Sequence, residues 1–210
     1  MKERRNSLLV LVRRRSDYAP EQKKKGMPDP DREELLRKGF ARMGWPPYDP
    51  AGICRTKTGK PYVRNPQVPC EFNYSDAKTY CAAAFGERPI GIDIEEIRSP
   101  SVHLLRRLSA EERGYLRDAA DPTERNRRFV RIWTAKEAFG KMMGTGLTKE
   151  ILETDFTAAV GRVIPQRFFS DISDTQTVRM VTEQMTLCGT LCLFGQSLVQ
   201  NVWISVCMKR

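Results

Sequence analysis

The hydrophobic and polar positions along the chain follow two periods, which together predict a mixture of strands and helices. Alternating or continuous apolar runs predict strands over residues 7–12, 79–85, 90–95, 178–185, 187–194 and 201–207. Apolar residues at helical spacing, with start and stop signals, predict helices over residues 32–43, 109–119 and 122–143. Because the predicted order is a strand, a helix, further strands, then helices and then strands again, we expect an α+β fold.

Capping signals mark the ends of the predicted helices. Asp31 is a candidate N-cap for the first helix, and Ser109-Ala-Glu-Glu112 has the pattern of a capping box. Asp121-Pro122 places a cap and a first-turn proline before the longest helix. Gly144-Thr-Gly146 is expected to end that helix.

Two halves are expected, with a seam near residues 96–100. Gly86-Glu-Arg-Pro89 separates two neighbouring predicted strands, which indicates a hairpin-like connection. Past Ser99-Pro100 the helical patterns begin. We therefore predict an N-terminal half over residues 1–98 and a C-terminal half over residues 99–210.

Composition and charge exclude several classes of protein. Of the 210 residues, 40% are hydrophobic, so the chain can bury a core and is not disordered throughout. No apolar run approaches the roughly 18 residues of a membrane span. The apolar run Leu8–Val12 is too short to be the hydrophobic region of a signal peptide, and it is followed directly by Arg13-Arg-Arg15. We expect neither membrane insertion nor export.

The cysteine and histidine content argues against zinc and against histidine-dependent hydrolysis. The six cysteines include no Cys-x-x-Cys pair, and His103 is the only histidine. Without an export signal, the cysteines should be reduced and the protein cytoplasmic.

Asp93 and Glu95 are the first candidates for residues of a functional site. Because side chains alternate along a strand, both carboxylates face away from Ile92 and Ile94. Such paired oxygen ligands favour Mg²⁺ or Mn²⁺. A solvated strand face is the alternative, and the pair alone does not decide between them.

The predicted helix over residues 122–143 carries the second set of candidates. Lys136 lies in the middle of an apolar stripe, while Glu137 lies at its border with Lys141 one turn further on. An ordinary surface Glu–Lys pair beside a snorkelling Lys136 would explain the pattern. The functional alternative makes Glu137 a third metal carboxylate or a general base.

Four motifs, in order over residues 59–147, resemble the 4'-phosphopantetheinyl transferases of the Sfp type. They are Gly59-Lys-Pro-Tyr62, Phe72-Asn-Tyr-Ser75, Ile90-Gly-Ile-Asp-Ile-Glu95 and Trp133-Thr-Ala-Lys-Glu-Ala-Phe-Gly-Lys141. The last two match the family signature G-[IV]-D-x-E followed by W-[ST]-x-K-E-[AS]-x-x-K. Gly144-Thr-Gly-Leu147 is also similar to the family.

The resemblance implies transfer of the phosphopantetheine arm of coenzyme A to a serine of an apo acyl or peptidyl carrier protein, with release of 3',5'-ADP. It also implies a pseudo-twofold pair of similar α+β halves with coenzyme A in the cleft between them. The chain length favours a monomer of two joined halves. Excess positive charge, formally +10, suits a polyanionic cofactor and an acidic partner.

The resemblance also assigns roles to individual residues. Asp93, Glu95 and Glu137 match the family's Mg²⁺ carboxylates, and Glu137 is also its candidate catalytic base. Lys141 matches a catalytic, cofactor-binding lysine that neutralises the leaving phosphate. The remaining cofactor-binding positions implied by the match are Lys60, Ser75, Asp76 and Lys136.

Asp76 departs from the family pattern, because it stands where the family has a histidine that donates to a cofactor phosphate. An ionised carboxylate cannot donate a hydrogen bond and repels a phosphate. Asp76 could join the metal shell, turn away, or weaken coenzyme A binding and catalysis. The basic residues that might hold the 3'-phosphate are not clearly placed; the available ones are Lys23–Lys25, Arg37, Lys38 and Arg42.

Two alternatives to the transferase stay open from the sequence. A catalytically weakened relative could merely bind coenzyme A or a carrier domain, and Asp76 is its support. A basic nucleic-acid-binding module is less expected, since it rests on net charge without a recognisable nucleic-acid-binding motif.

Overall fold

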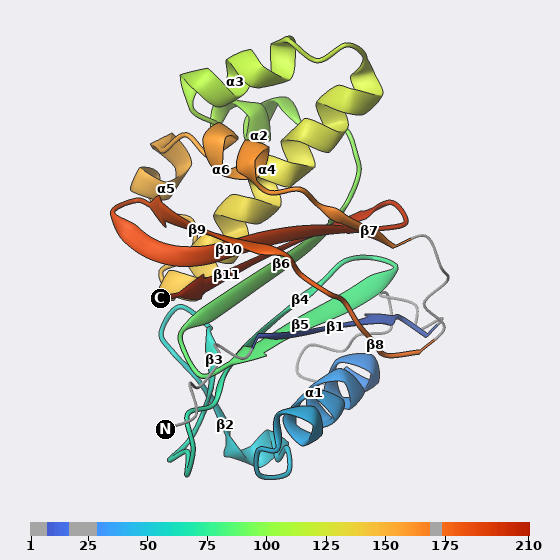
Figure 1. Cartoon of the computed structure of the whole chain (residues 1–210), viewed down its shortest axis with the longest axis vertical. Coiled ribbons are helices and arrows are strands. Elements are labelled where there is room, and N and C mark those ends of the chain that lie inside the picture. Colours follow the sequence, from blue (N-terminus) through green and yellow to red (C-terminus); the bar gives the residue numbers. More distant parts are fainter. Residues whose placement is uncertain (1–7, 17–28, 169–173) are drawn as a thin grey trace.

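The computed structural model describes residues 8–16, 29–168 and 174–210. It has four layers, with a helix, two sheets and a group of helices stacked in that order (Figure 1). The mixed α+β class predicted from the sequence is confirmed. Across the described ranges, no helix is both long and apolar enough to cross a membrane.

The first sheet is antiparallel and is covered on its outer face by α1 (Pro30–Met43). Its strands, in the order β4-β5-β1-β8, are β4 (Glu71–Asp76), β5 (Tyr80–Gly86), β1 (Leu9–Arg14) and β8 (Gln176–Thr177). Beside it lie the short helix η2 (Pro50–Gly52) and a small hairpin of β2 (Ile53–Arg55) and β3 (Pro61–Val63).

The second sheet lies between the first sheet and the remaining helices (Figure 1). Its strands are β6 (Ile90–Glu96), β11 (Val202–Lys209), β10 (Thr190–Val199) and β7 (Gln166–Phe168) in that order, with β9 (Thr182–Leu187) also paired to β10. The helices are α2 (Val102–Arg106), α3 (Ala110–Arg117), α4 (Pro122–Met143), α5 (Lys149–Glu153) and α6 (Thr157–Arg162).

Strand β6 follows the predicted alternation. Ile90, Ile92 and Ile94 pack into the apolar core between the two sheets. The intervening residues therefore face α4. Gly91 allows a very close approach, because a Cβ at this position would lie 2.1 Å from the carbonyl oxygen of Ala138. The sequence places the carboxylates of β6 against this helix.

Gly91→Ala is expected to lower the free energy of unfolding by about 1–3 kcal/mol, because the added methyl group meets backbone rather than a movable side chain. Chemical denaturation followed by circular dichroism measures the loss. Gly161→Ala in α6 is the matched control, since nothing lies within 4 Å of its added Cβ. Equal stabilities of the two variants would contradict the close contact between β6 and α4.

The predicted hairpin between residues 79–85 and 90–95 is wrong. Strand β5 pairs with β1 and β4, whereas β6 pairs with β11 in the other sheet. Both edges of β5 are thus occupied, so the turn carries the chain from one sheet to the next. The proposed division into residues 1–98 and 99–210 stays a prediction.

The helix caps agree with the sequence except at α1. Asp29, not Asp31, caps α1 by accepting a hydrogen bond from the Arg32 amide at 3.2 Å. Asp31 is a buried residue of the first turn. The capping box of α3 and the Asp121 and Gly144 caps of α4 are confirmed. The strands β4, β7 and β8 and the short helices α2, α5 and α6 were not predicted from the sequence. The strand predicted over residues 178–185 is found further along, as β9 at Thr182–Leu187.

Candidate active site

Three predicted residues meet where β4, β6 and α4 come together. The Lys141 ammonium donates to Asp93 Oδ1 at 2.7 Å and to Ser75 Oγ at 2.9 Å. Ser75 Oγ in turn donates to the same Asp93 oxygen at 2.8 Å. One residue from each element therefore takes part in a closed polar contact.

Local structure fixes these three side chains. The buried Asn73 side chain accepts a hydrogen bond from the Ile92 amide at 3.2 Å, which holds β4 against β6 although they belong to different sheets. Gly144 ends α4 in the left-handed backbone conformation, with a φ of 73°. Lys141 is thereby held in the last turn of the helix, opposite β6.

Glu95 and Glu137 share the electrostatic environment of Asp93. Burial raises the pKa of Glu95 above its ordinary value, and repulsion from Asp93 raises it further. Burial is also the main reason that the pKa of Glu137 is raised, with Asp93 next. The Lys141 ammonium opposes this shift at both glutamates. The three carboxylates thus act on one another across the gap between β6 and α4.

The donor set fits a divalent cation by its chemistry. Oxygen ligands suit Mg²⁺, and Asp93 Oδ2 is buried without a hydrogen-bond partner. Within the described ranges, no three His, Cys, Asp or Glu side chains form a ready-made metal cluster. In this structure the Lys141 ammonium forms an ion pair with Asp93 and balances its negative charge.

A pocket adjoins these residues and is lined by cations and glycines. Arg55, Lys60 and Lys141 contribute positive charge, and Gly144 and Gly146 leave the backbone open at the end of α4. The Lys60 ammonium donates to the carbonyl of Met142 at 3.0 Å. Burial lowers the pKa of Lys60. Glu71 lies 3.8 Å from the Lys60 ammonium and favours its charged form, as an anionic ligand in this pocket would also do.

Lys136 does not join the other predicted residues. It is fully buried, and its ammonium forms a 3.0 Å ion pair with Glu112 of α3. It also donates to the carbonyls of Ile151, Leu152 and Thr154. The expected cofactor contact of Lys136 is corrected accordingly, because its side chain faces the helical layer rather than the pocket.

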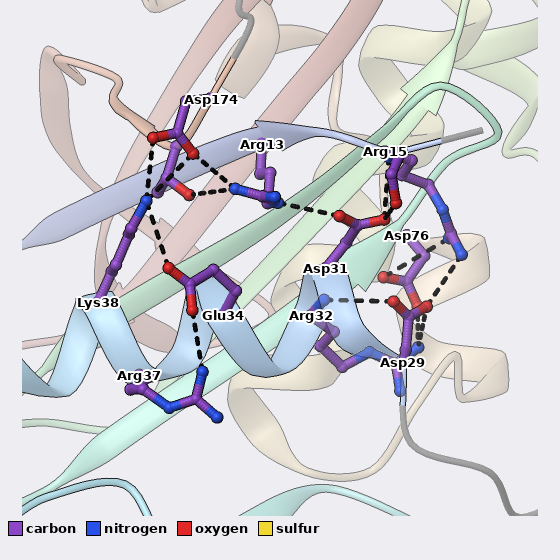
Figure 2. A network of polar contacts seen from close by, with 12 residues as sticks. Arg13, Arg15, Asp29, Asp31, Arg32, Glu34, Arg37, Lys38, Asp76 and Asp174 are labelled. Atoms are coloured by element: carbon purple, nitrogen blue, oxygen red, sulfur yellow. Dashed lines mark hydrogen bonds and ion pairs between the residues drawn. The ribbon is translucent and has the colours of Figure 1, made fainter. Parts of the chain in front are cut away.

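Asp76 contacts arginines, not the carboxylates. Figure 2 shows it beside Arg15 and Arg32, and its Oδ2 atom accepts a hydrogen bond from Arg32. Arg15 lies 4.0 Å from Oδ1. Of the three alternatives for Asp76, these contacts match a side chain that turns away from Asp93.

The predicted 3'-phosphate candidates are already engaged where they are described. Arg37 and Lys38 both pair with Glu34, and Lys38 also pairs with Asp174 (Figure 2). Arg42 donates to the Thr177 hydroxyl. Lys23–Lys25 lie outside the described residues.

Comparison with known proteins identifies the segment that carries most of these residues. A family model described as the 4'-phosphopantetheinyl transferase superfamily matches residues 89–191. Those residues belong to this superfamily. The resemblance predicted from the motifs is therefore confirmed, and its Sfp-type character is supported by relatives of that kind.

Individual phosphopantetheinyl transferases extend the comparison. The chain is 38% identical over 103 residues to psf-1 of Bacillus pumilus, covering 48% of this chain and 42% of that protein. It is 34% identical over 91 residues to Sfp of Bacillus subtilis, covering 43% and 40%. It is 28% identical over 163 residues to an L-aminoadipate-semialdehyde dehydrogenase-phosphopantetheinyl transferase of Xenopus laevis, covering 68% and 54%. The chain thus spans about half the length of these relatives, or less.

Sequence reasoning missed several residues around this site. Asn73 joins β4 to β6, and Arg55 and Tyr74 line the pocket. Asn73 and Tyr74 lie inside the recognised Phe72–Ser75 motif, so that motif was the available signal. No comparable signal in the sequence marks Arg55.

Proposed function

We propose that this protein transfers the 4'-phosphopantetheine arm of coenzyme A to a serine of an apo acyl or peptidyl carrier protein. The observation that carries the proposal is the meeting of Ser75, Asp93 and Lys141 beside a cationic pocket. The superfamily match over residues 89–191 supports the same activity. Coenzyme A is the co-substrate and 3',5'-ADP the second product.

In the proposed reaction the carrier serine oxygen forms a bond to the phosphorus of the phosphopantetheine arm. The bond from that phosphorus to the oxygen of 3',5'-ADP breaks, and the serine proton passes to Glu137. As a general base, Glu137 would make the serine oxygen more nucleophilic. Lys60 and Lys141, which both line the pocket, would stabilise the charge on the diphosphate.

Asp93, Glu95 and Glu137 are the residues that would hold Mg²⁺. A bound Mg²⁺ would neutralise diphosphate charge and make the phosphorus easier to attack. Lys141 would then be available to the phosphate, because the cation would take over its role as partner of Asp93. The unpartnered Asp93 Oδ2 atom supports this assignment.

We further propose a monomer built of two similar halves, over residues 1–98 and 99–210, with coenzyme A between them. Each half supplies a sheet with helical cover on its outer face, which supports this arrangement (Figure 1). The strand exchange of β6 and β8 would tie the halves together. We also propose a cytoplasmic location, where the cysteines would be reduced.

Incubating the purified chain with coenzyme A, Mg²⁺ and an apo carrier protein tests the activity. Intact-mass spectrometry should show the carrier gaining one phosphopantetheinyl group, and a chelator should abolish the gain. Coenzyme A binding without a mass gain would contradict catalysis and favour a protein that only binds the cofactor. Testing a panel of fatty acid, polyketide and peptide carrier domains would identify the partner.

A further inference from the structure

A buried polar contact joins α4 to the second sheet beside Asp93. Thr134 Oγ1 of α4 lies 2.7 Å from Ser205 Oγ of β11, and both residues are fully buried. Ser205 is the register partner of Asp93 in the antiparallel pairing of β11 with β6, so the two side chains are neighbours on one face of the sheet. The contact therefore crosses the same gap between helix and sheet as the candidate metal carboxylates.

Gln196 of β10 completes this contact. Its Nε2 donates to Ser205 Oγ at 2.9 Å and to the carbonyl of Arg131 at 3.0 Å. Because Ser205 Oγ accepts from Gln196, the hydroxyl proton of Ser205 is available to Thr134. Thr134 Oγ1 in turn donates to the carbonyl of Val130 at 2.9 Å. A buried polar network whose members all have partners favours a single arrangement of the elements it joins.

The same face of α4 carries this contact to the candidate site. Thr134, Ala138 and Lys141 follow one another at helical spacing, so they lie on one side of the helix. The backbone of Ala138 approaches Gly91 closely, and Lys141 donates to Asp93. The helix thus meets the sheet through a polar contact, a steric contact and an ion pair.

Of these contacts, the ion pair would have to open under the proposed function. Lys141 would then bind phosphate, and Asp93 would bind a divalent cation instead. The hydrogen bond between Thr134 and Ser205 takes no part in that exchange. Glu137 lies three residues after Thr134 on α4, so a small rotation of the helix at Thr134 would move Glu137 relative to Asp93. Ligand distances at a metal site are fixed to within about 0.2 Å, so such a movement would weaken binding.

We propose that Thr134 and Ser205 are positioning residues, whose hydrogen bond holds Glu137 of α4 at the right distance from Asp93 of β6 for one divalent cation. This inference rests on the proposed function and deepens its metal site. Neither hydroxyl contacts the cation or the cofactor in this proposal. An apolar pair would fill the same space, but it would lack the directional contact that fixes the rotation of α4.

Titration of the full chain with Mn²⁺, first alone and then with coenzyme A present, tests the inference. Electron paramagnetic resonance of free Mn²⁺ gives the Kd. Thr134→Val keeps the shape of the side chain but removes the hydroxyl, and it should weaken Mn²⁺ binding by about tenfold, as loss of a group that orients metal ligands does. Thr134→Ser keeps the hydroxyl and should bind Mn²⁺ as the wild type does. A purely structural role would lower stability to denaturant without changing the Kd of the folded protein.

Ser205→Ala removes the same hydrogen bond from the side of the sheet. It should weaken Mn²⁺ binding as Thr134→Val does, and the double variant should bind no more weakly than either single variant. Thr186→Val is the matched control, because it makes the same chemical change at an exposed position of β9. Its Kd for Mn²⁺ should equal that of the wild type.

Three other results would overturn the inference. An unchanged Kd in both Thr134→Val and Ser205→Ala would overturn it and leave the proposed function intact. An equal loss in Thr134→Ser and Thr134→Val would do the same, because the hydroxyl would then not be the group that matters. A wild-type chain that binds Mn²⁺ neither alone nor with coenzyme A would contradict the proposed metal site together with the inference.

Discussion

Replacing Asp93 by asparagine should lower kcat/KM for carrier modification by about 10²- to 10³-fold, the loss typical of removing one electrostatic catalytic group. Asparagine keeps the shape of the side chain but removes the charge that Lys141 and Ser75 contact. It also removes an anionic ligand from the proposed Mg²⁺ site. Initial rates of carrier mass gain at varied coenzyme A concentration measure the effect.

Asp118→Asn makes the same chemical change at an exposed position and should retain wild-type rates. Circular dichroism of both variants separates loss of fold from loss of chemistry. Full transfer activity in Asp93→Asn would be incompatible with the role assigned to this carboxylate.

Lys136→Met should lower the free energy of unfolding by about 3–5 kcal/mol, because it leaves Glu112 buried without its cation. Both side chains of the pair are fully buried. Burial raises the pKa of Glu112 and lowers that of Lys136, so each depends on the other to remain charged. Urea denaturation measures the loss of stability.

The double variant Lys136→Met with Glu112→Leu should recover part of this loss, since no unpaired charge remains in the core. The exposed pair Lys149 and Glu153 provides a control, and Lys149→Met should change stability very little. Unaltered stability of Lys136→Met would show that its ammonium is not held in the core.

Regular patterns in the sequence were sufficient to predict the local structure around the site. The alternation of β6 predicted that Asp93 and Glu95 share a face, and that face is turned to α4. The cap residues Asp121 and Gly144 defined the ends of α4. These predictions rest on short-range geometry, which the chain determines within a few residues.

Features that depend on distant partners could not be predicted in this way. Periodicity placed Lys136 on an apolar helix face but could not show that Glu112 of α3 forms an ion pair with it. Asp76 contacts Arg15 and Arg32, which lie far from it in the sequence. The N-cap of α1 is different, because Pro30 at the first helical position was a readable signal for Asp29.

Asp93, Glu95 and Glu137 are proposed to bind one divalent cation beside the cofactor pocket. Anomalous X-ray diffraction from crystals grown with Mn²⁺ and coenzyme A would locate this cation. We expect a single manganese peak within coordination distance of oxygens from all three carboxylates, with Lys141 contacting phosphate. A manganese ion bound elsewhere, or a Glu137 side chain directed away from Asp93, would contradict it.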